Sequence, residues 1–193
     1  MKFIVYTAIF LIIFSSLPLA EQYLCISTWW PSEIRFYGIP GPGSHPDGIT
    51  PVKTFSVPTF LIGLAFDGDN FWLCKDSTVY CFDVNGNPIK QFPNPYQDIS
   101  GLGSDGQYLW LSENVHGYSE EGYIYQIDTD GNPGPFVDFP VENIGGAIAI
   151  DTDNEIIIVG VDWDDGYDTM YGIETYDYFG NPLGGYYYSG DMY

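Results

Sequence analysis

Asp83-Val-Asn-Gly-Asn-Pro88 recurs as Asp128-Thr-Asp-Gly-Asn-Pro133 and again as Asp177-Tyr-Phe-Gly-Asn-Pro182. The intervals between the three copies are 45 and 49 residues. A similar pattern precedes each copy: an apolar step that ends in aspartate, an aromatic or β-branched run, and a second run that ends in the repeated aspartate. Repetition at this interval is typical of one supersecondary unit stacked several times.

Each unit consists of four short runs rich in aromatic and β-branched residues, bounded by Asp, Gly, Asn and Pro. This composition is typical of antiparallel strands joined by tight turns, and no segment has a helical period. We therefore predict an all-β fold with three four-stranded units over about residues 60–96, 97–140 and 141–193.

The Gly-Asn-Pro step is predicted to be the turn between the third and fourth strands of each unit. Glycine tolerates a positive φ, and proline can begin an edge strand because its missing N–H is harmless there. The preceding aspartate is expected to cap the turn through its own side chain. In the second unit this places the fourth strand over residues 132–139.

Large apolar residues recur at one place in the units. Trp72 and Trp110 each follow an aspartate by five residues, and Ile156 follows Asp151 by the same interval. We predict that Trp72, Trp110 and Ile156 form equivalent packing layers between neighbouring sheets.

Four-stranded units of 40 to 50 residues make β-propeller blades. Residues 63–73 (Gly-Leu-Ala-Phe-Asp-Gly-Asp-Asn-Phe-Trp-Leu) and residues 123–132 (Tyr-Ile-Tyr-Gln-Ile-Asp-Thr-Asp-Gly-Asn) resemble repeats of exported bacterial propellers. The similar proteins are those of the NHL, YVTN and virginiamycin B lyase-like superfamily. The resemblance covers about residues 60–188 and implies a β-propeller-like architecture.

The number of units departs from that resemblance, because such propellers close a ring with four to eight blades. Residues 21–59 supply two candidate strands, 23–27 and 33–38, followed by a Pro- and Gly-rich segment. We expect an open, three-bladed arc with the N-terminal strands against one end. We also expect that the sequence is truncated and that the chain self-associates through its open blade edges. Association of complete chains and irregular closure of four unequal blades are the alternatives.

Residues 1–20 resemble a secretory signal peptide: a basic start at Lys2, an apolar run over 3–14, and a processing region that ends at Ala20. The run is shorter than the roughly 20 residues of a membrane span. The protein is therefore predicted to be secreted, periplasmic or on the cell surface, with no membrane insertion after cleavage.

The chain is strongly acidic, with 26 acidic against five basic residues and a formal net charge of −21. Nucleic acid is excluded as a partner, because phosphate binding needs clustered lysine and arginine. Turn chemistry together with solubility, calcium affinity, or a salty habitat could each account for the excess of aspartate.

Asp162, Asp164 and Asp168 form the densest carboxylate cluster and are candidate calcium ligands, because calcium prefers oxygen donors from a tight loop. Their spacing departs from the EF-hand pattern, and a solvated loop is the alternative. The segments 112–122 and 160–169 lengthen the same connection in the second and third units, and variable loops often bind ligands. Candidate ligand-contacting side chains in these segments are Tyr118, Trp163 and Tyr167.

No nucleophile elbow, phosphate loop, zinc spacing or acid/base pair is recognisable, and His45 and His116 share no motif. Cys74 and Cys81 lie on neighbouring predicted strands, where a local disulfide is possible. We therefore expect a binding or surface-interaction module for a protein or carbohydrate partner, with calcium as a possible cofactor. The alternative is a metal-assisted lyase or a cyclotransferase-type propeller enzyme with its site at the central channel.

Overall fold

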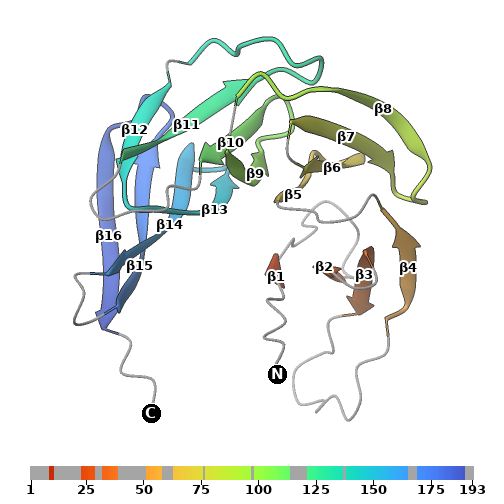
Figure 1. The fold of residues 1–193 in the computed structure, drawn as a ribbon, viewed down its shortest axis with the longest axis horizontal. Helices are drawn as coiled ribbons and strands as arrows, with labels where there is room; N and C mark the ends of the chain where they lie inside the picture. Colours follow the sequence, from red (N-terminus) through yellow and green to blue (C-terminus); the bar gives the residue numbers. More distant parts are fainter. Residues whose placement is uncertain are drawn as a thin grey trace.

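The computed structural model describes residues 9–10, 23–28, 32–38, 51–57, 63–75, 77–96, 98–113, 121–136, 138–164 and 169–189. The strands in these ranges form four antiparallel sheets of four strands each. The sheets follow one another in sequence order along an open arc, with the last strand of each on the outside (Figure 1). The prediction of an open, all-β arc of four-stranded, propeller-like units is confirmed.

We call the sheets blades 1 to 4. The strands of blades 1 and 2 are β1 (Ile9–Phe10), β2 (Tyr23–Thr28), β3 (Glu33–Gly38), β4 (Lys53–Ser56), β5 (Gly63–Phe66), β6 (Asn70–Lys75), β7 (Thr78–Asp83) and β8 (Pro88–Pro93). The strands of blades 3 and 4 are β9 (Ile99–Ser104), β10 (Leu109–Glu113), β11 (Glu121–Ile127), β12 (Phe139–Glu142), β13 (Ile144–Asp151), β14 (Ile156–Asp164), β15 (Thr169–Asp177) and β16 (Pro182–Ser189).

Blade 1 contains more strands than the two expected from the sequence. Lys53 to Phe55 of β4 pair with Phe36 to Ile34 of β3, and Ile9–Phe10 pairs with Ile26 and Cys25 of β2. β1 lies inside residues 1–20, so the cleavage predicted after Ala20 would remove it and leave blade 1 with three strands. The signal peptide itself stays a prediction.

The repeated Asp-x-x-Gly-Asn turn has one geometry in blades 2, 3 and 4. In blade 3, Asp128 Oδ1 accepts hydrogen bonds from the backbone N–H groups of Asp130 at 2.8 Å and Asn132 at 2.9 Å. Asp128 Oδ2 accepts a third bond from the Asn132 side-chain amide at 2.9 Å. Asp83 and Asp177 make the same three bonds in blades 2 and 4. The prediction that the aspartate caps this turn is confirmed.

The glycine of each turn lies against an aromatic ring of the preceding blade. Gly86, Gly131 and Gly180 have φ values of 84°, 88° and 80°. A Cβ atom at these positions would lie 2.5 to 2.7 Å from the rings of Phe55, Phe92 and Phe139, in that order. The turn therefore requires glycine at this position for two reasons: its positive φ and its close contact with the neighbouring blade.

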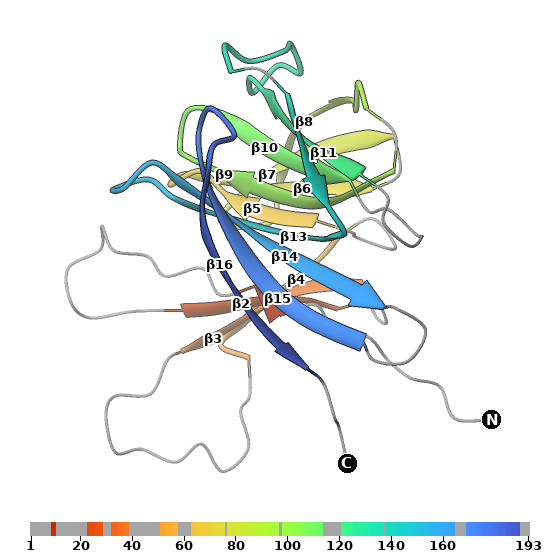
Figure 2. The ribbon, with the colours of Figure 1, turned by 90° about the vertical axis from the view of Figure 1, so that its left-hand side faces the viewer.

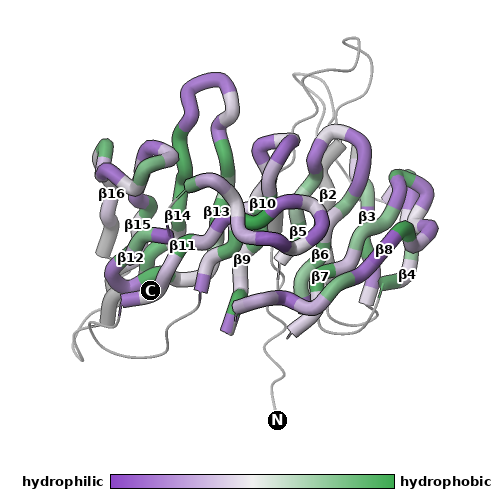
Figure 3. The backbone as a smooth tube through the Cα atoms, turned by 90° about the horizontal axis from the view of Figure 1, so that it is seen from above, coloured by the Kyte–Doolittle hydropathy of each residue, from purple (hydrophilic) through white to green (hydrophobic). Residues whose placement is uncertain are grey.

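The core is divided among the three junctions between successive blades. Blade 1 packs on blade 2 through a cluster that includes Ile34, Phe55 and Phe71. Two further apolar clusters join blade 2 to blade 3 and blade 3 to blade 4. Seen from above, the hydropathy along the chain alternates between apolar strands and polar turns (Figure 3). Each blade is therefore stabilised mainly by its neighbours, as in other repeat architectures.

The predicted tryptophan layer is confirmed for two blades and is wrong for the last. Trp72 and Trp110 are 2% and 1% exposed, and each indole N–H donates to the aspartate five residues earlier. Trp72 pairs with Cys81 and Trp110 with Gln126, each two residues before the turn aspartate. In blade 4 that register belongs to Ile158, which pairs with Thr175. The turn after Asp151 is two residues longer, so counting from the aspartate wrongly selected Ile156.

The fourth strand of blade 3 also differs from expectation. β8 and β16 begin at the proline of the Gly-Asn-Pro step, whereas β12 begins only at Phe139. Gly134 N–H bonds the Gln126 carbonyl at 2.7 Å, and Pro135 has no N–H to donate to a ladder. Pairing with β11 therefore stops after Gly134 and resumes at Phe139, where β12 begins.

Cys74 and Cys81 are free, buried thiols on the β6–β7 hairpin. Cys74 pairs with Val79, and Cys81 pairs with Trp72, so the two cysteines are not directly opposite each other. Among the described residues, no helix has the length and apolar character to span a bilayer.

Candidate interaction surfaces

The residues predicted to bind calcium fall on a hairpin and beyond it. Asp162 and Asp164 belong to β14, where they pair with Tyr171 and Thr169 of β15, and Asp168 lies outside the described residues. In the part of the chain that the structure describes, no three His, Cys, Asp or Glu side chains are grouped as metal ligands would be. The calcium site stays a prediction.

The predicted ligand loops are described only in part. Trp163 belongs to β14 and pairs with Met170, while Tyr118 and Tyr167 lie outside the described residues. His45 and His116 also lie outside them.

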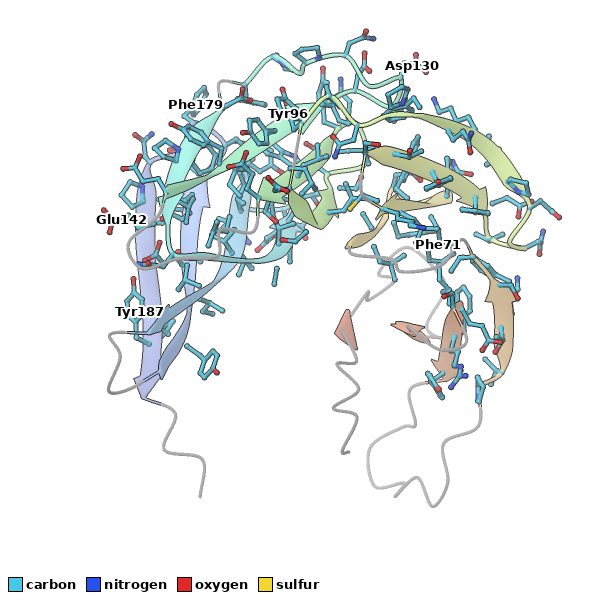
Figure 4. All side chains as sticks on the ribbon, viewed as in Figure 1. Phe71, Tyr96, Asp130, Glu142, Phe179 and Tyr187 are labelled. Carbon is cyan, nitrogen blue, oxygen red and sulfur yellow. The ribbon has the colours of Figure 1, made fainter. Side chains whose placement is uncertain are left out.

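Three tyrosines gather on blade 3 at the edge of its junction with blade 2. The rings of Tyr96 and Tyr125 stack with centroids 3.6 Å apart and planes 15° from parallel. The Tyr123 ring lies 6.1 Å from that of Tyr125, with planes 25° apart. Tyr123 and Tyr125 alternate along β11, and Tyr96 comes from the segment between β8 and β9 (Figure 4).

Glu113, at the end of β10, holds this group together. Its carboxylate accepts one hydrogen bond from the Tyr125 hydroxyl and another, at 2.9 Å, from the backbone N–H of Tyr123. We call Tyr96, Tyr123, Tyr125 and Glu113 the tyrosine cluster. It combines the exposed ring of Tyr123 and the half-buried rings of Tyr96 and Tyr125 with a carboxylate, which is a combination that suits a cation.

The electrostatics of the cluster are those of a partly dehydrated, anionic site. Burial raises the pKa of Tyr125, and the hydrogen bond to Glu113 raises it further. Burial raises the pKa of Tyr96, and the negative charge of nearby Asp138 adds to the effect. Burial also raises the pKa of Asp138. Both phenols therefore stay neutral at physiological pH.

The tyrosine cluster was not predicted from the sequence, although part of its signal is present there. Glu113 is the second residue of the 112–122 segment that was singled out as a variable connection. Tyr96 lies 27 residues before Tyr123 in the sequence, and its approach depends on how blades 2 and 3 pack. Only the alternation of Tyr123 and Tyr125 was visible in advance, and it resembles that of ordinary half-buried strands.

A second surface is the outer face of blade 4, which ends the arc (Figure 2). Ile173 of β15 is 44% exposed and Tyr186 of β16 is 79% exposed, and the two residues are cross-strand partners. The equivalent aliphatic residues of blades 2 and 3, Val79 and Ile124, are 0% and 1% exposed. We call Ile158, Ile173 and Tyr186 the blade 4 end face.

Tyr187, the next residue along β16, points to the opposite side. Its hydroxyl bonds Glu174, and its pKa is raised to about 12, chiefly by that hydrogen bond. Tyr187 and Glu142 lie along the same flank of the molecule (Figure 4). Tyr187 therefore belongs to the side of blade 4 that meets blade 3, and not to the blade 4 end face.

Comparison with solved structures supports the propeller-like fold. The chain is similar to the Pan2 WD40 domain of Neurospora crassa, with a TM-score of 0.51 and 14% identity over 86% of this chain and 51% of that one. It is also similar to a chain of a mitotic checkpoint complex, with a TM-score of 0.50 and 14% identity over 85% and 49%. A putative TolB from Agrobacterium tumefaciens follows with a TM-score of 0.49, 14% identity, and coverage of 86% and 60%.

The chain thus spans about half the length of the Pan2 domain and of the checkpoint-complex chain. No family model and no curated protein matches the sequence. The solved structures confirm a β-propeller-like architecture, while the predicted membership of the NHL, YVTN and virginiamycin B lyase-like group stays a prediction.

Proposed function

We propose that this chain is an exported binding module whose propeller-like scaffold presents the tyrosine cluster to a protein partner. The partner would contribute arginine or lysine side chains. The observation that carries the proposal is the stack of Tyr96 on Tyr125, with Glu113 bonded to the edge of the stack.

Cation recognition follows from the chemistry of that surface. A guanidinium group can stack on a tyrosine face and bond a carboxylate at the same time. Tyrosine and arginine are enriched in protein interfaces, where a few such residues supply most of the binding energy. The net charge of −21 would also steer a basic partner toward the chain.

The proposal can be tested with a labelled peptide that alternates glycine with six arginines. Tyr96→Ser removes one ring of the stack, and Glu113→Gln removes the charge with little change of shape. We expect each variant to bind the peptide roughly tenfold more weakly in a titration by fluorescence anisotropy.

Asp153→Asn is the matched control, because it removes one negative charge from an exposed turn of blade 4, away from the cluster. If Asp153→Asn and Glu113→Gln weaken binding equally, the peptide senses only the total charge and the proposed site is wrong. A neutral oligosaccharide that binds the wild type and loses affinity in Tyr96→Ser would instead identify a carbohydrate-binding module.

A further inference from the structure

The blade 4 end face is built like the faces that are covered elsewhere in this chain. Tyr186 pairs with Ile173, just as Phe55 pairs with Ile34, Phe92 with Val79, and Phe139 with Ile124. Ile34, Val79 and Ile124 are at most 1% exposed because the next blade covers them. The pairing of β15 with β16 therefore matches that of the third and fourth strands in blades that are covered by a following blade.

The first and third junctions within the chain share one contact between two aromatic rings, and the middle junction places an aromatic residue at the same position. Phe55 meets Phe82 of the next blade with ring centroids 6.3 Å apart, and Phe139 meets Tyr176 at 5.4 Å. At the middle junction, Phe92 packs on the cluster that contains Ile127. In each case the residue of the next blade (Phe82, Ile127 or Tyr176) lies directly before the turn aspartate, three positions after the aliphatic residue on the opposite face of its own blade.

The same register identifies the matching residue on blade 1. Tyr37 lies three positions after the covered aliphatic residue Ile34, as Phe82 does after Val79. Tyr37 is half-buried, and the side of blade 1 that carries it has no preceding blade in the arc (Figure 1). Among the described residues, no blade covers this front, and Tyr37 of a second copy stands at the position that a partner for Tyr186 requires.

The extent of the arc sets the number of copies. The chain superposes on 51% of the Pan2 WD40 domain, so one copy supplies about half of such a ring. A head-to-tail contact can close into a ring of two copies related by twofold symmetry, in which the same interface occurs twice.

We propose that the blade 4 end face docks on blade 1 of a second copy, with Tyr186 of each copy against Tyr37 of the other. The two copies contribute four blades each to one closed ring. This proposal does not depend on the tyrosine cluster, which lies on blade 3.

Salt separates this proposal from the proposed function. Two copies that each carry a net charge of −21 repel one another, and salt screens that repulsion. Dimerisation should therefore strengthen as the salt concentration rises, whereas binding of a basic peptide to the tyrosine cluster should weaken.

Sedimentation equilibrium of the full chain over a range of concentrations and salt tests the proposal. The wild type should form a species of twice the 21.6 kDa chain mass. Tyr186→Ser and Tyr37→Ser should each raise the dissociation constant roughly tenfold or more. Ile89→Ser, which changes a 52% exposed residue on β8 of blade 2, should leave it unchanged. Circular dichroism spectra that match the wild type would show that all three variants fold.

Mixing the two tyrosine variants distinguishes this arrangement from other dimers. In an equimolar mixture, the mixed pair retains one intact Tyr186–Tyr37 interface and should dimerise more tightly than either variant alone. A dimer that Tyr37→Ser leaves intact would show contact between two blade 4 faces and overturn the proposal. A monomer at every concentration and salt, or a ladder of species larger than the dimer, would also overturn the two-copy ring.

Discussion

At the residue scale, the repeated turn shows how little sequence is needed to define one geometry. In blades 2, 3 and 4 the aspartate accepts three hydrogen bonds and the glycine takes a positive φ, although the two residues between them vary freely. Both roles were predictable, because they follow from the chemistry of single residues. The contact of the glycine with a ring of the preceding blade was not, since it depends on how two blades pack.

Gly131→Ala should therefore cost more stability than Gly106→Ala. Both glycines have a φ of 88°, so alanine at either one should cost about 1–2 kcal/mol of backbone strain. At Gly131 the new Cβ would also lie 2.7 Å from the Phe92 ring, whereas at Gly106 the nearest atom is 3.5 Å away. Overpacking should add about 1–3 kcal/mol at Gly131 alone, measurable by urea unfolding.

Phe92→Ala provides the control for that contact. In the Phe92→Ala background, the difference between the two glycine variants should shrink, because the crowded ring is gone. An unchanged difference would mean that the ring does not limit the size of the residue at Gly131.

The turn aspartates also predict how stability depends on pH. Hydrogen bonds from the following asparagines lower the pKa of Asp83, Asp128 and Asp177 below its ordinary value of 3.8. A carboxyl whose pKa is lower in the folded chain stabilises that state fully above the ordinary value, and this stabilisation is lost as the pH falls further. The melting temperature should therefore decrease as the pH falls below about 4.

Asp128→Asn should flatten that decrease, because one of the three linked carboxylates is gone. Asp153→Asn removes the same charge without changing a turn cap, and its melting curve should keep the wild-type slope. Parallel calorimetric scans between pH 2 and pH 6 compare the two variants, and equal slopes would contradict the assignment to the turn.

At the element scale, strand identity was predictable but strand register was not. The aromatic and β-branched runs at 70–74, 78–83, 108–111 and 122–128 predict strands close to the observed bounds of β6, β7, β10 and β11. The two extra residues in the Asp151 turn moved the tryptophan position from Ile156 to Ile158, a shift that only the pairing with β15 shows. Of the candidate site, the sequence marked the segment that contains Glu113 but not the tyrosines that it joins.

The β6–β7 hairpin should keep its thiols unreactive. Burial raises the pKa of Cys74 to about 12 and that of Cys81 to about 11, and the thiolate is the reactive form. In a Cys25→Ser background, the folded chain should react with a disulfide reagent at pH 8 at least a hundred times more slowly than the chain in urea. Fast labelling of two thiols under native conditions would show that the hairpin opens readily.

At the scale of the whole molecule, stability is shared between neighbouring blades and should therefore vary along the arc. Blades 2 and 3 each pack against two neighbours, whereas blades 1 and 4 each pack against one. In such an arrangement, the stability of each blade depends on its own strands and on its junctions, so the end blades open first.

The sequence predicted the open arc, but the four-stranded form of blade 1 emerges only from the pairing of β3 with β4 and of β2 with β1.

Hydrogen exchange followed by mass spectrometry should therefore show a gradient of protection. At low concentration and low salt, peptides from β6, β7, β10 and β11 should exchange most slowly, and peptides from β15 and β16 much faster. Raising the concentration in high salt should slow exchange in β15 and β3, where Ile173 and Tyr37 lie, and leave β10 unchanged. The internal control is β7, because Val79 occupies the position of Ile173 but is already covered. Uniform protection across all four blades under both conditions would contradict the gradient. It would mean that the arc unfolds as one cooperative unit and that its end blades are not stabilised by a second copy.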